Sequence, residues 1–128
     1  MRMLAGLGVA LVLAAVGYAD STRNAGLGEV ANCLRGGGAK VELSPMLREA
    51  APWKELVGRR GSGVYEIELG GDRGTLLRVG RDVGAKQLQA VLDAEGARVT
   101  AQSSGRILAL WYGRPAAGSA AALNRCLH

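Results

Sequence analysis

Hydrophobic and polar residues follow two periods along this chain, and each period predicts one kind of element. Apolar residues that recur every three or four positions are typical of an amphipathic helix, whereas short apolar or alternating runs are typical of strands. The helical pattern predicts three main helices, at residues 21–35, 83–95 and 115–127. The strand pattern predicts five strands, at residues 39–43, 64–69, 75–79, 97–102 and 106–112.

Four of these strands are expected to form two β-hairpins. In the first, a turn at residues 70–74 places Ile67 opposite Leu77 and Glu66 opposite Arg78. This register pairs apolar with apolar residues and acid with base, which stabilises neighbouring strands.

The second hairpin is predicted to turn at residues 103–105. Its strands then bring Val99 and Ala101 against Leu110 and Leu108, so that one side of the hairpin is apolar.

The helix at 83–95 connects the two hairpins and sets the expected topology. A helix between strands is ordinarily a right-handed crossover that joins parallel strands, so strands 75–79 and 97–102 are expected to run parallel. The predicted fold class is α+β: a two-layer sandwich in which a mixed sheet of about five strands carries three main helices on one face.

Residues 44–63 interrupt this pattern between the first two strands. Ser44 suits the N-cap of a short helix, Pro52 ends that helix, and Trp53–Val57 predict a second one. Residues 59–63 are rich in arginine and glycine and predict a flexible loop.

The first nineteen residues have the pattern of an export signal. Arg2 precedes an uncharged apolar run, and Gly17-Tyr18-Ala19 supplies the two small residues that a signal peptidase site requires. We expect a signal peptide at 1–19 and one domain at 20–128, secreted, periplasmic or elsewhere in the cell envelope of a bacterium. The alternative is an uncleaved signal anchor, which makes the chain a single-pass membrane protein with the same domain outside.

The two cysteines, Cys33 and Cys126, fit this location. An even number of cysteines behind an export signal predicts a disulfide, which here would join the first and last helices and close the domain. The chain has no Cys-x-x-Cys motif and its one histidine is the terminal His128, so we expect no redox pair, no metal site and no cofactor.

The charge pattern bears on the partner. The chain carries 16 Lys and Arg against 11 Asp and Glu, a net charge of +5. A nucleic-acid site requires basic residues that are grouped with aromatic residues, whereas the arginines of this chain are scattered along the sequence. We therefore expect no nucleic-acid partner. Contact with a membrane is expected only through an uncleaved leader.

No group of residues predicts a catalytic site. The serines lack a base and an orienting partner, and His128 is terminal. Glu66 and Glu68 project from the same face of one strand, as paired carboxylates in acid/base catalysis do. The pattern favours a solvated strand face that Arg78 neutralises, because no Asp-rich loop accompanies the two glutamates, so we expect a non-enzymatic protein.

The outer side of the predicted sheet is the candidate binding surface. It combines Glu66, Arg78, Arg98 and Trp111, and Trp53 of the neighbouring segment is a further candidate. The alternative is that Trp111 packs beneath residues 44–60, which would then cover this face.

The sequence thus predicts an exported small binding or interaction module that acts through the sheet face or residues 44–63. Its partner is expected to be a protein or small ligand of the cell envelope, of unknown identity. A small extracytoplasmic enzyme that uses carboxylates and a membrane-tethered accessory subunit are the alternatives.

Overall fold

The computed structural model describes residues 26–58 and 63–128. The predicted leader at 1–19, the start of the first helix and most of the loop at 59–63 lie outside the described residues. The described elements in chain order are α2 (Leu27–Gly36), β1 (Lys40–Leu43), α3 (Pro45–Arg48), α4 (Trp53–Val57), β2 (Tyr65–Leu69), β3 (Asp72–Arg78), α5 (Ala85–Glu95), the 3₁₀ turn η1 (Gly96–Arg98), β4 (Val99–Ser104), β5 (Ile107–Tyr112) and α6 (Ala117–Leu127).

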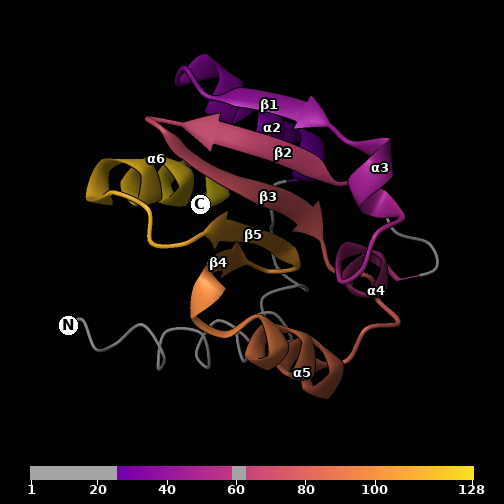
Figure 1. Ribbon diagram of the computed structural model, residues 1–128. Coiled ribbons are helices and arrows are strands. Elements are labelled where there is room, and N and C mark those ends of the chain that lie inside the picture. Colours follow the sequence, from indigo (N-terminus) through magenta and orange to yellow (C-terminus); the bar gives the residue numbers. More distant parts are fainter. Residues whose placement is uncertain (1–25, 59–62) are drawn as a thin grey trace.

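The five strands form one sheet in the order β1-β2-β3-β5-β4 (Figure 1). The α+β class and the five strands are therefore confirmed. Every neighbouring pair is antiparallel, so the prediction of a mixed sheet is wrong. Strands β3 and β4 do run in the same direction, but β5 folds back between them and pairs with both.

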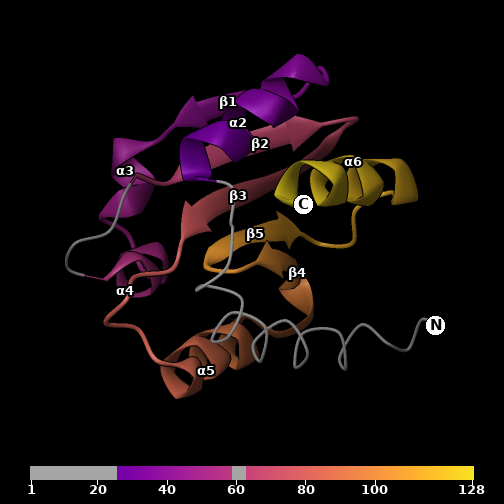
Figure 2. The same cartoon turned by 180° about the vertical axis from the view of Figure 1, so that it is seen from behind.

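Helices cover both faces of the sheet, so the prediction of two layers with three helices on one face is also wrong. Helices α2 and α6 lie in front of the sheet in Figure 2. Helices α4 and α5 contribute to a second apolar cluster on the opposite face. We call these two sides the α2/α6 face and the α4/α5 face.

The central strands explain the extra layer, because they are apolar on both sides. Leu76 and Leu77 are successive residues of β3 and both are fully buried, one on each face of the sheet. Residues 107–111 of β5 are all buried as well. A strand that is apolar at every position needs cover on both faces, as in the centre of a three-layer fold.

The first hairpin has a different register from the predicted one. Gly70 and Gly71 alone form the turn, both with positive φ, and Leu69 lies opposite Asp72. The predicted five-residue turn is wrong because Gly74 belongs to β3. A Cβ atom at Gly74 would lie 2.6 Å from the backbone oxygen of Leu110, so glycine is required there for the close approach of β5.

The second hairpin keeps its predicted faces but is displaced by two residues. Ala101 lies opposite Leu110, and Val99 lies opposite Tyr112. Because the displacement is even, Val99 and Ala101 still point toward the same face as Leu108 and Leu110.

Each of the three main helices buries apolar residues at the three- and four-residue spacing that is typical of an amphipathic helix. In α2 the buried residues are Leu27, Val30, Ala31 and Leu34. Helix α5 begins at Ala85 after Gly84, two residues later than the predicted start at residue 83. In α6 the inward residues are Ser119, Leu123 and Leu127.

The segment after β1 forms the two predicted short helices. Ser44 caps α3 through a hydrogen bond from the Leu47 N–H to its hydroxyl, 3.2 Å. Helix α4 buries Trp53, Leu56 and Val57 against the α4/α5 face. No helix of the described residues is long and apolar enough to span a bilayer.

Candidate functional site

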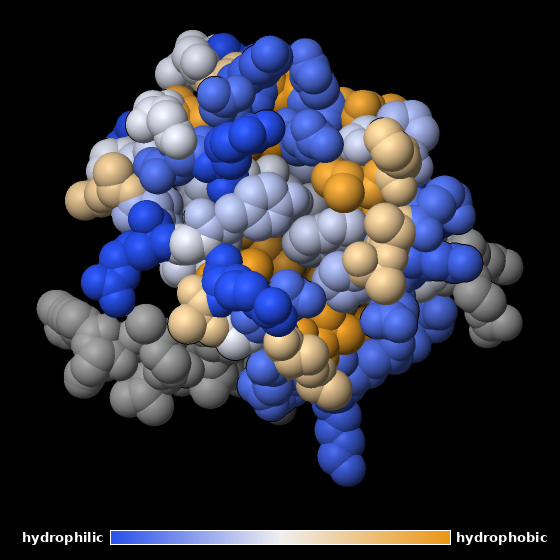
Figure 3. Space-filling view, viewed as in Figure 1, coloured by the Kyte–Doolittle hydropathy of each residue, from blue (hydrophilic) through white to orange (hydrophobic). Residues whose placement is uncertain are grey.

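The α4/α5 face carries a polar groove where β1 and β2 extend beyond the helices. Its volume is about 150 Å³. The residues that line it are Lys40, Glu42, Glu66, Ile67, Glu68, Arg73, Gly74 and Tyr112. Hydrophilic residues gather in the upper part of Figure 3, over the region where Figure 1 shows β1 and β2.

Strand pairing arranges the charged residues of the groove in two rows across the sheet. One row joins Lys40, Glu68 and Arg73, so acid and base alternate. In the next row, Glu42 of β1 lies directly opposite Glu66 of β2. The neighbour of Glu66 on its other side is Thr75, which is neutral.

The second row therefore places two carboxylates side by side without a base between them. Residues directly opposite in an antiparallel pair have Cβ atoms about 4.5–5.5 Å apart, and like charges at that distance destabilise the sheet. Both glutamates are exposed, so solvent screens the repulsion.

Tyr112 bounds the groove on the side of the helices. Its hydroxyl forms a hydrogen bond with the hydroxyl of Thr75, which is completely buried. Its ring lies 6.5 Å from that of Trp53 in α4, measured between ring centroids, and the residue is 49% exposed. An aromatic ring thus stands where the polar groove meets the apolar core.

The two tryptophans among the predicted candidates are buried on opposite faces. Trp111 is 1% exposed on the α2/α6 face, and its indole N–H donates to Gln102 Oε1 at 2.6 Å. It lies neither on an open surface nor beneath the segment after β1. Trp53 packs in the core of the α4/α5 face.

The two arginines are also apart from the groove. Arg78 is half-buried and lies opposite Ile107, so it belongs to the α2/α6 face. Arg98 donates to the carbonyls of Ala94 and Glu95 and thereby caps α5. Of the five predicted surface residues, only Glu66 lines the groove.

Sequence reasoning missed four polar groove residues, which are Lys40, Glu42, Arg73 and Tyr112. A usable signal was present in Lys40-Val41-Glu42, because a strand with polar residues on either side of a buried valine exposes one polar face. Arg73 was assigned to the turn, and the wrong register of the first hairpin hid its position.

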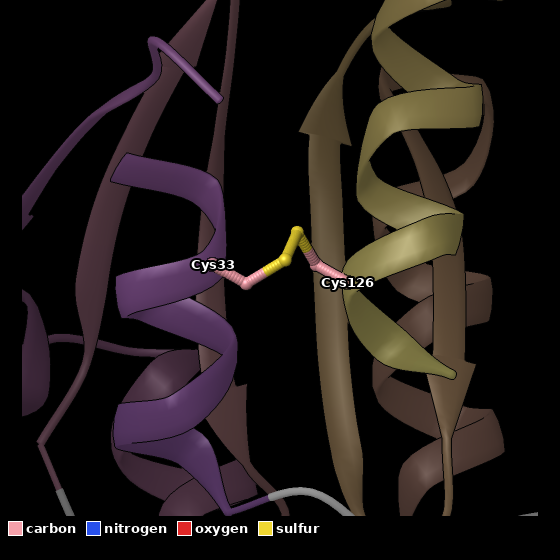
Figure 4. Close-up of a disulfide and its surroundings, with 2 residues drawn as sticks. All are labelled: Cys33 and Cys126. Atoms are coloured by element: carbon pink, nitrogen blue, oxygen red, sulfur yellow. A yellow bond between two sulfur atoms is a disulfide. The ribbon is translucent and has the colours of Figure 1, made fainter. Parts of the chain in front are cut away.

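The predicted disulfide is present. Cys33 of α2 and Cys126 of α6 are joined by an S–S bond of 2.02 Å (Figure 4). Their sequence separation is 93 residues, and Cys33 is exposed. Among the described residues, no three His, Cys, Asp or Glu side chains are grouped so that they could hold a metal ion.

Another hollow, of about 390 Å³, lies between α4 and α5. It is open, and its lining includes the apolar residues Ala90, Val91 and Ala94 and the acidic residues Glu55 and Glu95. It lacks the facing rows of acid and base that distinguish the sheet groove.

Comparisons with known proteins do not identify a relative: the chain matches no protein-family model, no curated protein and no solved structure.

Proposed function

We propose that this protein is an exported, non-enzymatic binding module, and that the groove on its sheet binds a cationic group of a protein or small ligand. The observation that carries the proposal is the facing pair Glu42 and Glu66. The two carboxylates repel each other in the free protein, and a bound ammonium or guanidinium group would relieve that repulsion.

The rest of the groove suits a ligand that also carries a negative charge. Lys40 and Arg73 flank Glu68 in the neighbouring row and offer donors to a carboxylate or phosphate. Tyr112 adds an exposed ring against which a cation can rest. A peptide segment with a basic residue beside an acidic one would satisfy both rows.

Export rests on two features of the chain. The leader pattern at Met1–Ala19 is that of a signal peptide, and the Cys33–Cys126 disulfide is consistent with an oxidising compartment. Cleavage predicts a mature chain that begins at Asp20, and the disulfide predicts that this chain is two mass units lighter than its reduced form. Intact-mass measurement of the protein from its native host tests this, and a chain that retains Met1 supports the membrane-tethered alternative.

The enzymatic alternative uses the same groove, since Glu66 and Glu68 both line it. Both carboxylates are exposed. Carboxyl groups that act as general acid or base are ordinarily enclosed so that their pKa values separate, and the exposure of this pair therefore favours binding over acid/base catalysis.

The test is capture of partners from the native cell envelope with three forms of the protein. The first is the wild type, and the second carries Glu42→Gln, Glu66→Gln and Glu68→Gln. The third is a control that removes the same charge elsewhere, through Glu49→Gln, Glu55→Gln and Glu95→Gln. We expect the control to retain the wild-type partner and the groove variant to lose it. Equal capture by all three forms would refute the proposal.

A further inference from the structure

The sheet has two edges, and they differ in how well they are protected. Strand β1 ends the sheet on one side and β4 ends it on the other. An open edge presents backbone N–H and C=O groups that can pair with another strand, and proteins commonly block such edges with charges or short strands.

The β1 edge is blocked. The Ser44 N–H donates to the Val64 carbonyl, so Ser44 directs its backbone groups toward β2. Successive residues of an antiparallel strand alternate in this direction, so Val41, three residues earlier, directs its backbone groups outward. Two nitrogens of Arg35 donate to that outward carbonyl, Nε at 3.2 Å and Nη2 at 3.0 Å. The third nitrogen of this guanidinium group, Nη1, donates to Asn32 Oδ1 within α2 at 2.9 Å.

The β4 edge has no such protection within the described residues. The strand has six residues, Val99–Ser104, and none of them is charged or proline. The Gly113 N–H donates to the Arg98 carbonyl just before β4. Because hydrogen-bonded positions alternate along an antiparallel strand, the even-numbered residues of β4 bond to β5. Ala101 and Ser103 therefore direct their N–H and C=O groups outward.

Side chains nevertheless hold β4 firmly in place. Gln102 accepts from the Trp111 indole and donates to the Ala120 carbonyl, 3.0 Å. Thr100 donates to the Gly113 carbonyl at 2.7 Å. The edge is thus uncharged and pre-organised, which lowers the entropic cost of pairing.

We infer that β4 pairs antiparallel with β4 of a second copy of this chain about a two-fold axis at Ala101. In this register Ala101 faces Ala101 and exchanges two hydrogen bonds with it, and Val99 faces Ser103. Two further bonds join each Ser103 N–H to the partner's Val99 carbonyl, because the Val99 N–H is already bonded to Gly96.

A second copy is the occupant that the edge favours, because a neutral strand meets no like charge when it pairs with itself. The blocked β1 edge prevents head-to-tail addition, so assembly stops at a closed dimer with one ten-stranded sheet. The two grooves would lie near the distant ends of that sheet and remain accessible. The inference does not depend on the proposed function of the groove.

The test is sedimentation velocity over a hundredfold range of concentration, with the full chain and two proline variants. Ala101→Pro removes an outward N–H from β4, and Leu43→Pro removes one from the blocked edge as a control. Proline is tolerated where the N–H faces outward from an edge strand. We expect the wild type and Leu43→Pro to dimerise and Ala101→Pro to dimerise at least about tenfold more weakly.

Amide hydrogen exchange of the wild type provides a readout that does not depend on a variant. Protection at Ala101 and Ser103 should rise with protein concentration. A monomer at every concentration overturns the inference. Protection that is independent of concentration also overturns it, since another segment of the same copy would then cover the edge.

Discussion

At the scale of single residues, Asp72 shows how one side chain links the first hairpin to the last helix. Its carboxylate accepts a hydrogen bond from the Ala116 N–H at 3.1 Å, which caps the start of α6. The neighbouring Ser119 side chain and this N–H hold the pKa of the Asp72 carboxyl below its ordinary value, while the Ser119 hydroxyl itself donates to the Leu69 carbonyl at 3.0 Å. The charged form is therefore favoured in the folded protein.

This shift predicts a loss of stability in acid. Because the folded pKa is depressed, the contribution of Asp72 is present above the unfolded value, near 3.9, and is lost as the pH falls below it. Denaturant unfolding of wild type and Asp72→Asn should show a difference in the free energy of unfolding at pH 7 that shrinks at pH 3. A difference that stays constant across this range would contradict the capping role.

At the scale of elements, two glycines make opposite predictions. Gly71 lies in the turn of the first hairpin with φ of 87°, which strains any residue with a Cβ, so Gly71→Ala should lower the free energy of unfolding by about 1–2 kcal/mol. Gly28 lies inside α2, where a Cβ atom would meet nothing within 4 Å, and Gly28→Ala should raise it by about 0.5–1 kcal/mol.

Thermal and denaturant unfolding of the two variants side by side measures this contrast. Equal effects of the same sign would show that the hairpin turn and the helix do not have the described backbone.

The same elements show how far the sequence could predict the fold. Local signals were sufficient for the buried stripe of α2, the Ser44 cap and the five strands, because each depends on residues close in sequence. The register of the first hairpin was not predictable in this way. Gly74 was interpreted as a turn residue, whereas its role is to admit the backbone of β5, a strand 33 residues or more away in sequence.

The candidate site was predicted less well than the fold. Because helices are expected on one face alone, the sequence leaves Trp111 either on an open surface or beneath residues 44–60. The apolar run at 107–111 is the signal that helices cover both faces. Glu66 was identified, but its partner Glu42 comes from a strand more than twenty residues earlier. Only the pairing of β1 with β2 brings the two carboxylates together.

At the scale of the whole molecule, the disulfide closes the described domain. Cys33 and Cys126 join helices that both pack on the α2/α6 face, at a sequence separation of 93. A loop of this length corresponds to about 4–5 kcal/mol in chain-entropy models. The variant with Cys33→Ser and Cys126→Ser should unfold at a correspondingly lower denaturant concentration.

The matched comparison for that experiment is the wild type with and without reductant. Reduction should lower the stability of the wild type to that of the double variant and leave the double variant unchanged. If the oxidised wild type is no more stable than the double variant, the disulfide does not stabilise the domain and this account of it is wrong.

The most direct test of the binding proposal is a residue-resolved NMR titration of the oxidised protein with a short lysine-rich peptide. A glutamate-rich peptide of equal length is the control. We predict saturable amide shifts from the lysine peptide that centre on Glu42, Glu66 and Tyr112 and that disappear in the Glu42→Gln, Glu66→Gln variant. Shifts confined to α5, or the same response in that variant, would contradict the assignment of the sheet groove as the binding site.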